Sequence, residues 1–122
     1  MAMYSFLDGM KSDFLKIISE KYSSAVDVDD LSIDYGASLE NLLLKYMALC
    51  QSSAALLSGA KSVNDELAMQ SALIRLRSYA IGLSSLFDAI ADNAETILKI
   101  GEWPELPEGY ELPDCYGNLG ND

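Results

Sequence analysis

Apolar residues recur at alternating steps of four and three along most of the chain, which is the spacing of one face of an α-helix. The longest row comprises Met69, Leu73, Leu76, Ala80, Leu83, Phe87, Ile90, Ala94 and Ile97. A second row comprises Leu39, Leu42, Tyr46, Leu49, Ser53 and Leu56, and a third comprises Met3, Leu7, Met10, Phe14 and Ile17. The rows predict helices near residues 4–22, 37–58 and 63–100, and therefore an all-α protein.

The apolar stripe on the third predicted helix is wider than a single row. Its flanking apolar residues are Ala72, Tyr79 and Leu86 on one side and Ile74 and Ile81 on the other. The second predicted helix is widened in the same way by Leu43, Cys50 and Leu57. Stripes of this width are typical of bundle helices that pack against two neighbours.

Residues that start and stop helices lie close to the predicted boundaries. Gly59 suits the left-handed position that ends the second helix, and Ser62 with Asp65 resembles a capping box that begins the third. Gly101 and Pro104 are expected to end the third helix. The short connection after Gly59 predicts an antiparallel hairpin of the second and third helices.

The predicted helices differ greatly in length. At about 1.5 Å per residue the third spans roughly 57 Å, whereas the first two span roughly 30 Å each. The long helix would bury its far half either by breaking near Gly82, which gives a four-helix bundle, or by packing on a second copy of the chain. We favour the homodimer, with Leu83, Phe87, Ile90 and Ile97 as the candidate oligomer interface.

Composition excludes several classes of function. The 122 residues carry a net charge of −11, which argues against direct binding of nucleic acid or of an anionic membrane. The absence of histidine excludes Ser-His-Asp catalysis and imidazole metal sites. Cys50 and Cys115 are too few for a disulfide framework. With no signal peptide and no apolar run of membrane-spanning length, we expect a cytoplasmic protein without a cofactor.

Two acidic clusters in the sequence are candidates for a metal site. Residues 23–36 are rich in aspartate, but they lack the glycine and the final glutamate of an EF-hand loop. An all-helical metal enzyme, such as a MazG-like nucleotide pyrophosphohydrolase, would need paired ExxE and ExxD motifs on facing helices. Asp88, Asp92 and Glu95 do lie on one helical face, but only Glu40 is available on the second helix to oppose them. We interpret them as a solvated face and expect no enzymatic activity.

The segment 34–39, which reads DYGASL, resembles the attachment region of acyl carrier proteins. The resemblance implies that Ser38 would carry phosphopantetheine. Ala37 stands where that family has aspartate, and the family has no counterpart of the long third helix. Turn and cap roles for Asp34 and Ser38 account for the same residues, so a degenerate acyl-carrier-like protein is a remote alternative.

Residues 102–122 are expected to form a Pro-rich acidic arm beyond a helical domain of residues 1–101. In triplets from residue 102, every first position is acidic: Glu102, Glu105, Glu108, Glu111 and Asp114. Polyproline II has three residues per turn, so an extended arm would align these acids in one stripe. Trp103, Leu106 and Leu112 could strap the arm to its own helices, or the arm could bind a partner.

Negative charge is concentrated near the C-terminus. Residues 79–122 hold nine acids and one base, which is −8 of the total −11. We therefore expect a non-enzymatic inhibitor or antagonist, of the small phage type, that covers a basic and even nucleic-acid-binding surface of a larger protein. The candidate partner-binding residues are Glu102, Trp103, Glu105, Leu106, Glu108, Tyr110, Glu111, Asp114, Asp88, Asp92 and Glu95. A homo-oligomeric scaffold or a small acidic chaperone is the alternative.

Overall fold

The computed structural model describes residues 3–21 and 31–114, and the regular structure in these residues is helical. The helices are α1 (Phe6–Lys21), α2 (Leu39–Ser62) and α3 (Glu66–Ile100). The prediction of an all-α fold is confirmed for this part of the chain. None of the three helices combines the length and apolar character that a membrane span requires.

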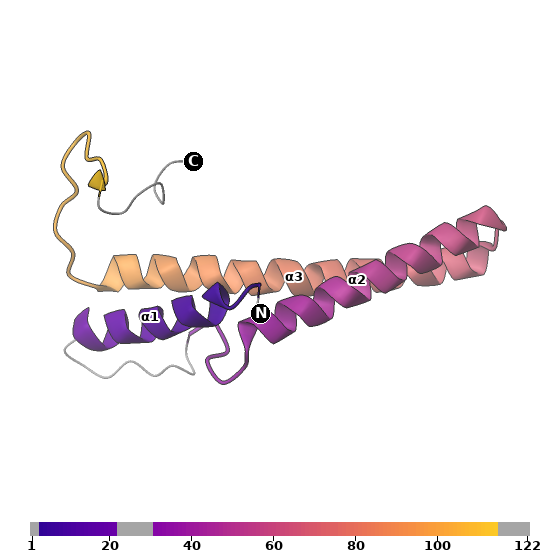
Figure 1. The fold of residues 1–122 in the computed structure, drawn as a ribbon, viewed down its shortest axis with the longest axis horizontal. Coiled ribbons are helices and arrows are strands. Elements are labelled where there is room, and N and C mark those ends of the chain that lie inside the picture. The colour runs from indigo at the N-terminus through magenta and orange to yellow at the C-terminus, as the bar shows by residue number, and fades with distance from the viewer. Residues whose placement is uncertain (1–2, 22–30, 115–122) are drawn as a thin grey trace.

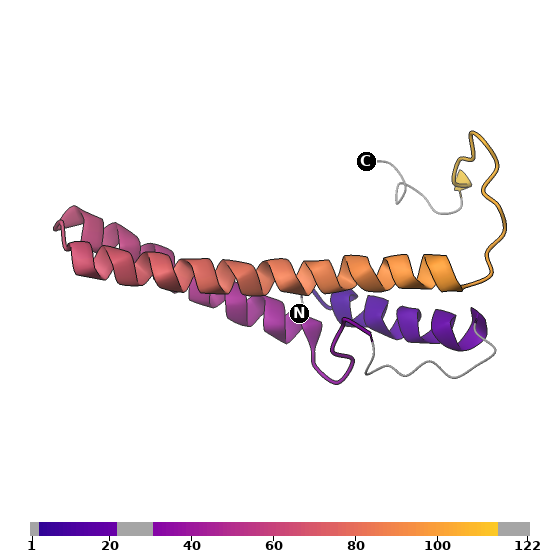
Figure 2. The same ribbon diagram turned by 180° about the vertical axis from the view of Figure 1, so that it is seen from behind.

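The helices form an elongated rod in which α3 is the longest element (Figures 1 and 2). α2 and α3 form the predicted antiparallel hairpin, and α1 lies along the second half of α3. At about 1.5 Å per residue α3 is about 52 Å long, α2 about 36 Å and α1 about 24 Å. Because α1 and α2 follow one another along α3, this helix has another helix beside each of its two halves.

Burial along α3 shows which side of its wide stripe packs on the rest of the chain. Ala72 and Leu86, on one predicted flank, are 0% and 8% exposed, and Asn93 on the same side is 1% exposed. Leu73 and Phe87, in the centre of the predicted row, are 52% and 50% exposed. α3 is therefore rotated so that a flank, and not the centre of the row, is buried most deeply.

The three helices meet around one small core cluster. This core cluster consists of Leu7 of α1, Ile33 of the segment that precedes α2, and Leu39 and Leu43 of α2. Leu83 and other residues of α3 pack against it. The cluster lies near the middle of the rod, where α1 and α2 both begin, and it joins all three helices.

Two carboxylates connect the starts of α1 and α2 by capping each other's helix. The carboxylate of Asp8 accepts hydrogen bonds from Leu39 N at 2.8 Å, from Ser38 Oγ at 3.0 Å and from Glu40 N at 3.3 Å. In return, Glu40 Oε2 accepts a hydrogen bond from Tyr4 N at 2.9 Å. Burial by itself would raise the pKa of Asp8, but the hydrogen bonds outweigh it and the pKa is lowered.

The connection between α2 and α3 differs from the predicted one. α2 continues through Gly59 to Ser62, and Asn64 takes the left-handed conformation with φ of 55°. The Ser62 hydroxyl donates to the carbonyl of Gly59 at 2.7 Å and so does not cap α3. Asp65 is the N-cap of α3, because its side chain accepts a hydrogen bond from Ala68 N at 3.1 Å. The expected roles of Gly59 and Ser62 were therefore wrong.

Candidate protein-binding site

The acidic face of α3 contains the three predicted carboxylates, and each has a neighbour that contacts it. The hydroxyl of Ser84 donates to Asp88 at 3.5 Å. Asp88, Asp92 and Glu95 are exposed. Asp92 accepts a hydrogen bond from the hydroxyl of Ser32, and Glu95 forms an ion pair with Lys99. The hydrogen bond to Glu95 and its negative charge raise the pKa of Lys99. Of these three negative charges, the ion pair with Lys99 offsets one.

Trp103 fixes the position at which the chain leaves α3. Its indole N–H donates to the carbonyl of Ile97 at 3.0 Å, and Lys21 Nζ lies 4.4 Å from the ring centroid. Lys21 also donates to the carbonyl of Glu102 at 2.9 Å. A Cβ on Gly101 would lie 2.6 Å from Trp103 Nε1, so glycine permits this close approach. Trp103 remains 41% exposed and joins the C-terminal ends of α1 and α3.

Beyond Trp103 the chain is exposed as far as Asp114. Leu106, Tyr110 and Leu112 are 75%, 51% and 52% exposed. Leu106 and Leu112 therefore do not strap this segment to the helices, and Trp103 alone of the three predicted straps is docked.

A turn interrupts the predicted stripe of acids. Tyr110 N donates to the carbonyl of Pro107 at 3.1 Å, and Gly109 adopts φ of +75°, as required at the third position of a type II turn. The chain reverses here (Figure 1), so the acids before and after residue 108 do not form one continuous polyproline II stripe. Residues 115–122, which complete the predicted arm, lie outside the described residues, as does Cys115.

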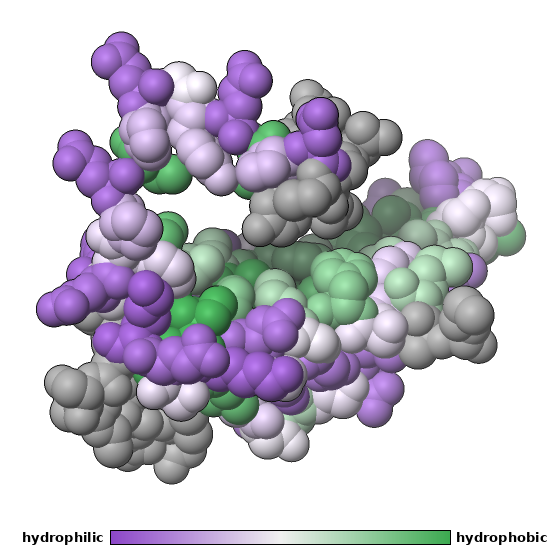
Figure 3. Space-filling model, turned by 60° about the vertical axis from the view of Figure 1, so that its left-hand side comes forward, coloured by the Kyte–Doolittle hydropathy of each residue, from purple (hydrophilic) through white to green (hydrophobic). Residues whose placement is uncertain are grey.

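The acids of this segment form no ion pair with a basic side chain in the described part of the chain. In residues 3–21 and 31–114, ion pairs join only Lys11 with Asp8 and Lys99 with Glu95. The acidic segment, a name we use for residues 102–114, consists of exposed residues that include Glu102, Glu105, Glu108, Glu111 and Asp114. In Figure 3 its hydrophilic side chains stand apart from the hydrophobic residues of the helices.

Most of the candidate oligomer residues are used within the chain. Ile97 is 5% exposed, so little of its side chain is available to a second copy. Leu83 and Ile90 are half-buried against the core cluster, whereas Phe87 is 50% exposed. Of the four predicted residues, Phe87 alone retains a large exposed surface.

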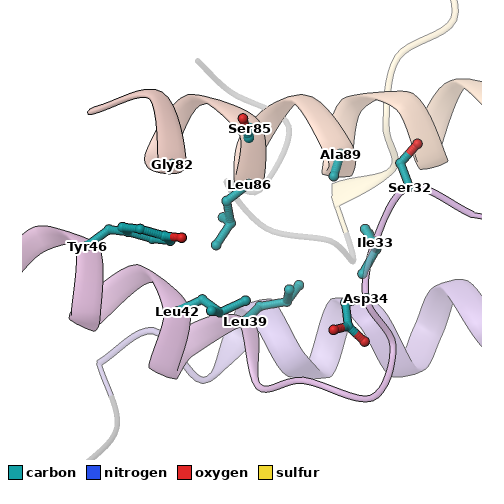
Figure 4. A pocket seen from close by; sticks show the side chains of 10 residues that line it. All are labelled: Ser32, Ile33, Asp34, Leu39, Leu42, Tyr46, Gly82, Ser85, Leu86 and Ala89. Atoms are coloured by element: carbon teal, nitrogen blue, oxygen red, sulfur yellow. The ribbon is translucent and has the colours of Figure 1, made fainter. Parts of the chain in front are cut away.

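An apolar pocket of about 200 Å³ lies between the start of α2 and the middle of α3 (Figure 4). Its lining residues are Ser32, Ile33, Asp34, Leu39, Leu42, Tyr46, Gly82, Ser85, Leu86 and Ala89. In the described residues no group of three histidine, cysteine, aspartate or glutamate side chains is placed to hold a metal ion. The pocket is suited to an apolar side chain or a small apolar molecule.

Ser38, the serine that the acyl-carrier resemblance would modify, is the N-cap of α2. Its Oγ accepts a hydrogen bond from Asn41 N at 3.2 Å and donates one to Asp8 at 3.0 Å. Asp34 likewise accepts from Gly36 N at 2.9 Å within a turn. The interpretation of these two residues as turn and cap is confirmed.

Comparison with protein families, with characterised proteins and with solved structures found no significant match. The proposed function therefore rests on the residues of this chain alone. Lys21 lies over the ring of Trp103 and donates a hydrogen bond to the carbonyl of Glu102. It was not among the predicted site residues. Its position in the last turn of a helix is the one signal in the sequence, since a cation there is favoured by the helix dipole.

Proposed function

We propose that this protein is a non-enzymatic binding module whose acidic segment contacts a basic surface on a larger cytoplasmic protein. The supporting observation is that five acids within thirteen residues are exposed and form no ion pair with the described bases. Uncompensated charge at one end of a molecule creates a field that attracts and orients a cationic partner.

The docking of Trp103 supports this function because it fixes where the acidic segment begins. The turn at 107–110 then presents acids on both sides of a loop. Exposed ion pairs alone contribute little binding energy, so apolar anchors are also needed. Leu106, Tyr110 and Leu112 are exposed between the acids and would provide them.

The form of this function that we propose is an inhibitor or antagonist that covers a basic, nucleic-acid-binding surface, as would suit a small phage-type protein. A loop of carboxylates competes for the same lysine and arginine side chains that bind phosphates. The protein itself would then bind no nucleic acid.

The test uses two full-length variants of equal net charge. One neutralises acids of the loop: Glu105→Gln, Glu108→Gln and Glu111→Gln. The control neutralises exposed acids elsewhere: Asp13→Asn, Glu20→Gln and Glu66→Gln. A partner captured from nuclease-treated lysate at low salt should elute at high salt, and its association rate should fall for the loop variant and much less for the control. Equal rates for the loop variant and the unmodified chain would reject the proposal.

Exposed apolar residues on the helices favour a second candidate function. Met47, Leu73 and Phe87 are each at least 50% exposed. Surfaces of this kind would serve a homo-oligomeric scaffold or a small acidic chaperone. Under this alternative, neutralising the acidic segment leaves function intact, whereas Phe87→Asp abolishes it.

A further inference from the structure

α1 covers only part of the surface that α2 and α3 share. Leu43 of α2 belongs to the core cluster with Leu7 of α1, and Leu83 of α3 packs against that cluster. Toward the tip of the hairpin, beyond the start of α1, apolar residues continue at helical spacing from Leu43 along α2 and from Leu83 along α3. These residues, which we call the distal face, are Met47, Cys50, Ala54 and Leu57 on α2 and Leu73, Leu76 and Ala80 on α3.

The distal face is apolar and partly open to solvent. Met47 is 50% exposed and Leu73 52%, and Ala54 and Ala80 are also exposed. A solvated helix face normally carries charged residues, whereas this one carries none. The distal face therefore has the character of an interface that the single chain leaves uncovered.

Long stretches of both helices around this face lack charge altogether. Residues 46–60, 67–74 and 78–87 contain no aspartate, glutamate, lysine or arginine. Elsewhere in this chain of net charge −11, no uncharged stretch is longer than seven residues.

The start of α1 extends the apolar surface at the near end of the distal face. Tyr4 N donates to Glu40 at 2.9 Å, which holds the beginning of α1 beside the beginning of α2. Met3 and Phe6, at this end of α1, are 76% and 62% exposed.

We propose that the occupant of the distal face is the distal face of a second copy, related by a two-fold axis. The two hairpins would then form an antiparallel four-helix bundle, with α1 of each chain continuing the bundle outward. Because the two faces are identical, every apolar residue on one meets an apolar residue on the other.

The distribution of charge favours a second copy over a basic partner at this place. Residues 43–82 carry four bases and two acids, net +2, and the remaining residues therefore carry net −13. The negative charge lies in residues 22–42, net −5, and in residues 83–122, net −8, so two copies repel each other mainly through these parts. Association through the hairpins brings together segments of low net charge and keeps the acidic ends apart.

A standard interface covers about 800 Å² on each partner, and the distal face would form the centre of such a contact. Ala54 and Ala80 are small enough to let the facing helices approach closely.

The proposal does not depend on a partner for the acidic segment. The proposed interface lies on the first half of α3, and Phe87 lies just outside this interface. Cys50 and Leu76 stand near the middle of their rows and so near the two-fold axis.

The first test is the molar mass of the full-length protein by light scattering and sedimentation equilibrium. We expect a dimer with twice the 13.3 kDa chain mass. Leu73→Asp should weaken the dimer at least tenfold, because a buried carboxylate would replace an apolar contact. Ile74→Asp is the matched control, since Ile74 is 67% exposed on the next residue of α3 but lies outside the distal face.

A monomeric unmodified protein at about 100 μM, well above the Kd of a stable dimer, would overturn the proposal. So would a dimer that resists Leu73→Asp, or an equal effect of Ile74→Asp. Circular dichroism checks that the variants remain helical. If Leu73→Asp unfolds the chain, Met47→Lys provides the same comparison from α2.

The second test examines the two-fold axis. In a Cys115→Ser background, a short thiol-specific cross-linker should join Cys50 of one chain to Cys50 of the other, and Leu73→Asp should prevent this. A dimer that forms but is not cross-linked would place Cys50 away from the axis and overturn the arrangement.

Discussion

The ring of Tyr46 on α2 packs directly against the backbone of Gly82 on α3. A Cβ on Gly82 would lie 2.6 Å from Tyr46 Cε1 and 2.8 Å from Cζ, closer than any ordinary contact. The absence of a side chain at Gly82 is therefore what allows the ring to pack there. α3 passes through Gly82 as one helix, so this glycine serves close packing and does not break the helix.

Gly82→Ala should destabilise the protein although alanine favours helix. The gain in helix propensity is about 1 kcal/mol, but displacing the Tyr46 ring costs about 1–3 kcal/mol. In a Tyr46→Ala background the same change should stabilise by up to about 1 kcal/mol, because the clash is removed. Urea unfolding of the two single variants and the double variant measures this reversal.

Gly59→Ala is the matched control for Gly82→Ala. Gly59 also lies within a helix, and nothing lies within 4 Å of the position that its Cβ would take. We expect it to stabilise the protein by about 0.5–1 kcal/mol. Loss of stability in this variant would show that glycine has a backbone role at Gly59.

Asp8→Asn should remove a cap that α1 provides to α2. The neutral amide is a poorer acceptor for the N–H groups of Leu39 and Glu40, so we expect a loss of about 1 kcal/mol. Asp13→Asn, at an exposed position of the same helix, should change stability by less than about 0.5 kcal/mol.

The contribution of Asp8 should depend on pH. Its pKa is lower in the folded than in the unfolded state, where it is near 3.8. The unfolded state therefore binds a proton first, and the stabilisation present above that value is lost as the pH falls through the lower folded pKa. The difference between the unmodified chain and Asp8→Asn should shrink below about pH 4. A difference that is constant down to pH 2 would contradict this account.

Asn93→Ala should destabilise the protein by about 1–3 kcal/mol. Asn93 is 1% exposed, and its Oδ1 accepts a hydrogen bond from Ile33 N at 2.8 Å. The substitution leaves that N–H buried without its acceptor and loosens the segment that leads into α2. Asn41→Ala, at an exposed position of α2, is the control, and thermal unfolding compares the two. Similar melting temperatures for both variants would show that this hydrogen bond contributes little.

Lys21→Ala should loosen Trp103, which is the single tryptophan of the chain. The cation–π contact contributes about 0.5–1 kcal/mol at an exposed site, and the hydrogen bond to the Glu102 carbonyl is lost as well. Acrylamide should therefore quench Trp103 fluorescence more strongly in this variant. Lys16→Ala, an exposed lysine of α1, should leave quenching unchanged.

Helix content and approximate boundaries follow from residues that are close in sequence. The four-and-three spacing of apolar positions is a property of neighbouring turns of one helix, so it identified all three helices and the hairpin. The end of α2 was misplaced because both Gly59 and Asn64 are able to adopt a left-handed conformation. The local sequence does not decide between them.

The candidate site was predictable only in part, for the same reason. The periodic acids from Glu102 to Asp114 and their exposure follow from composition, but the turn at Gly109 interrupts a periodicity that the triplets alone suggest. The docking of Trp103 depends on Lys21, which is distant in sequence and becomes its neighbour only when α1 packs along α3.

The sequence by itself determined that the chain forms three amphipathic helices with an acidic end, because periodicity and charge are local properties. Tertiary structure alone decided which side of each wide stripe is buried. That choice depends on how closely two backbones approach, as at Tyr46 and Gly82, and on carboxylates such as Asp8 that cap a different helix. The same choice of buried side leaves the distal face uncovered in the single chain.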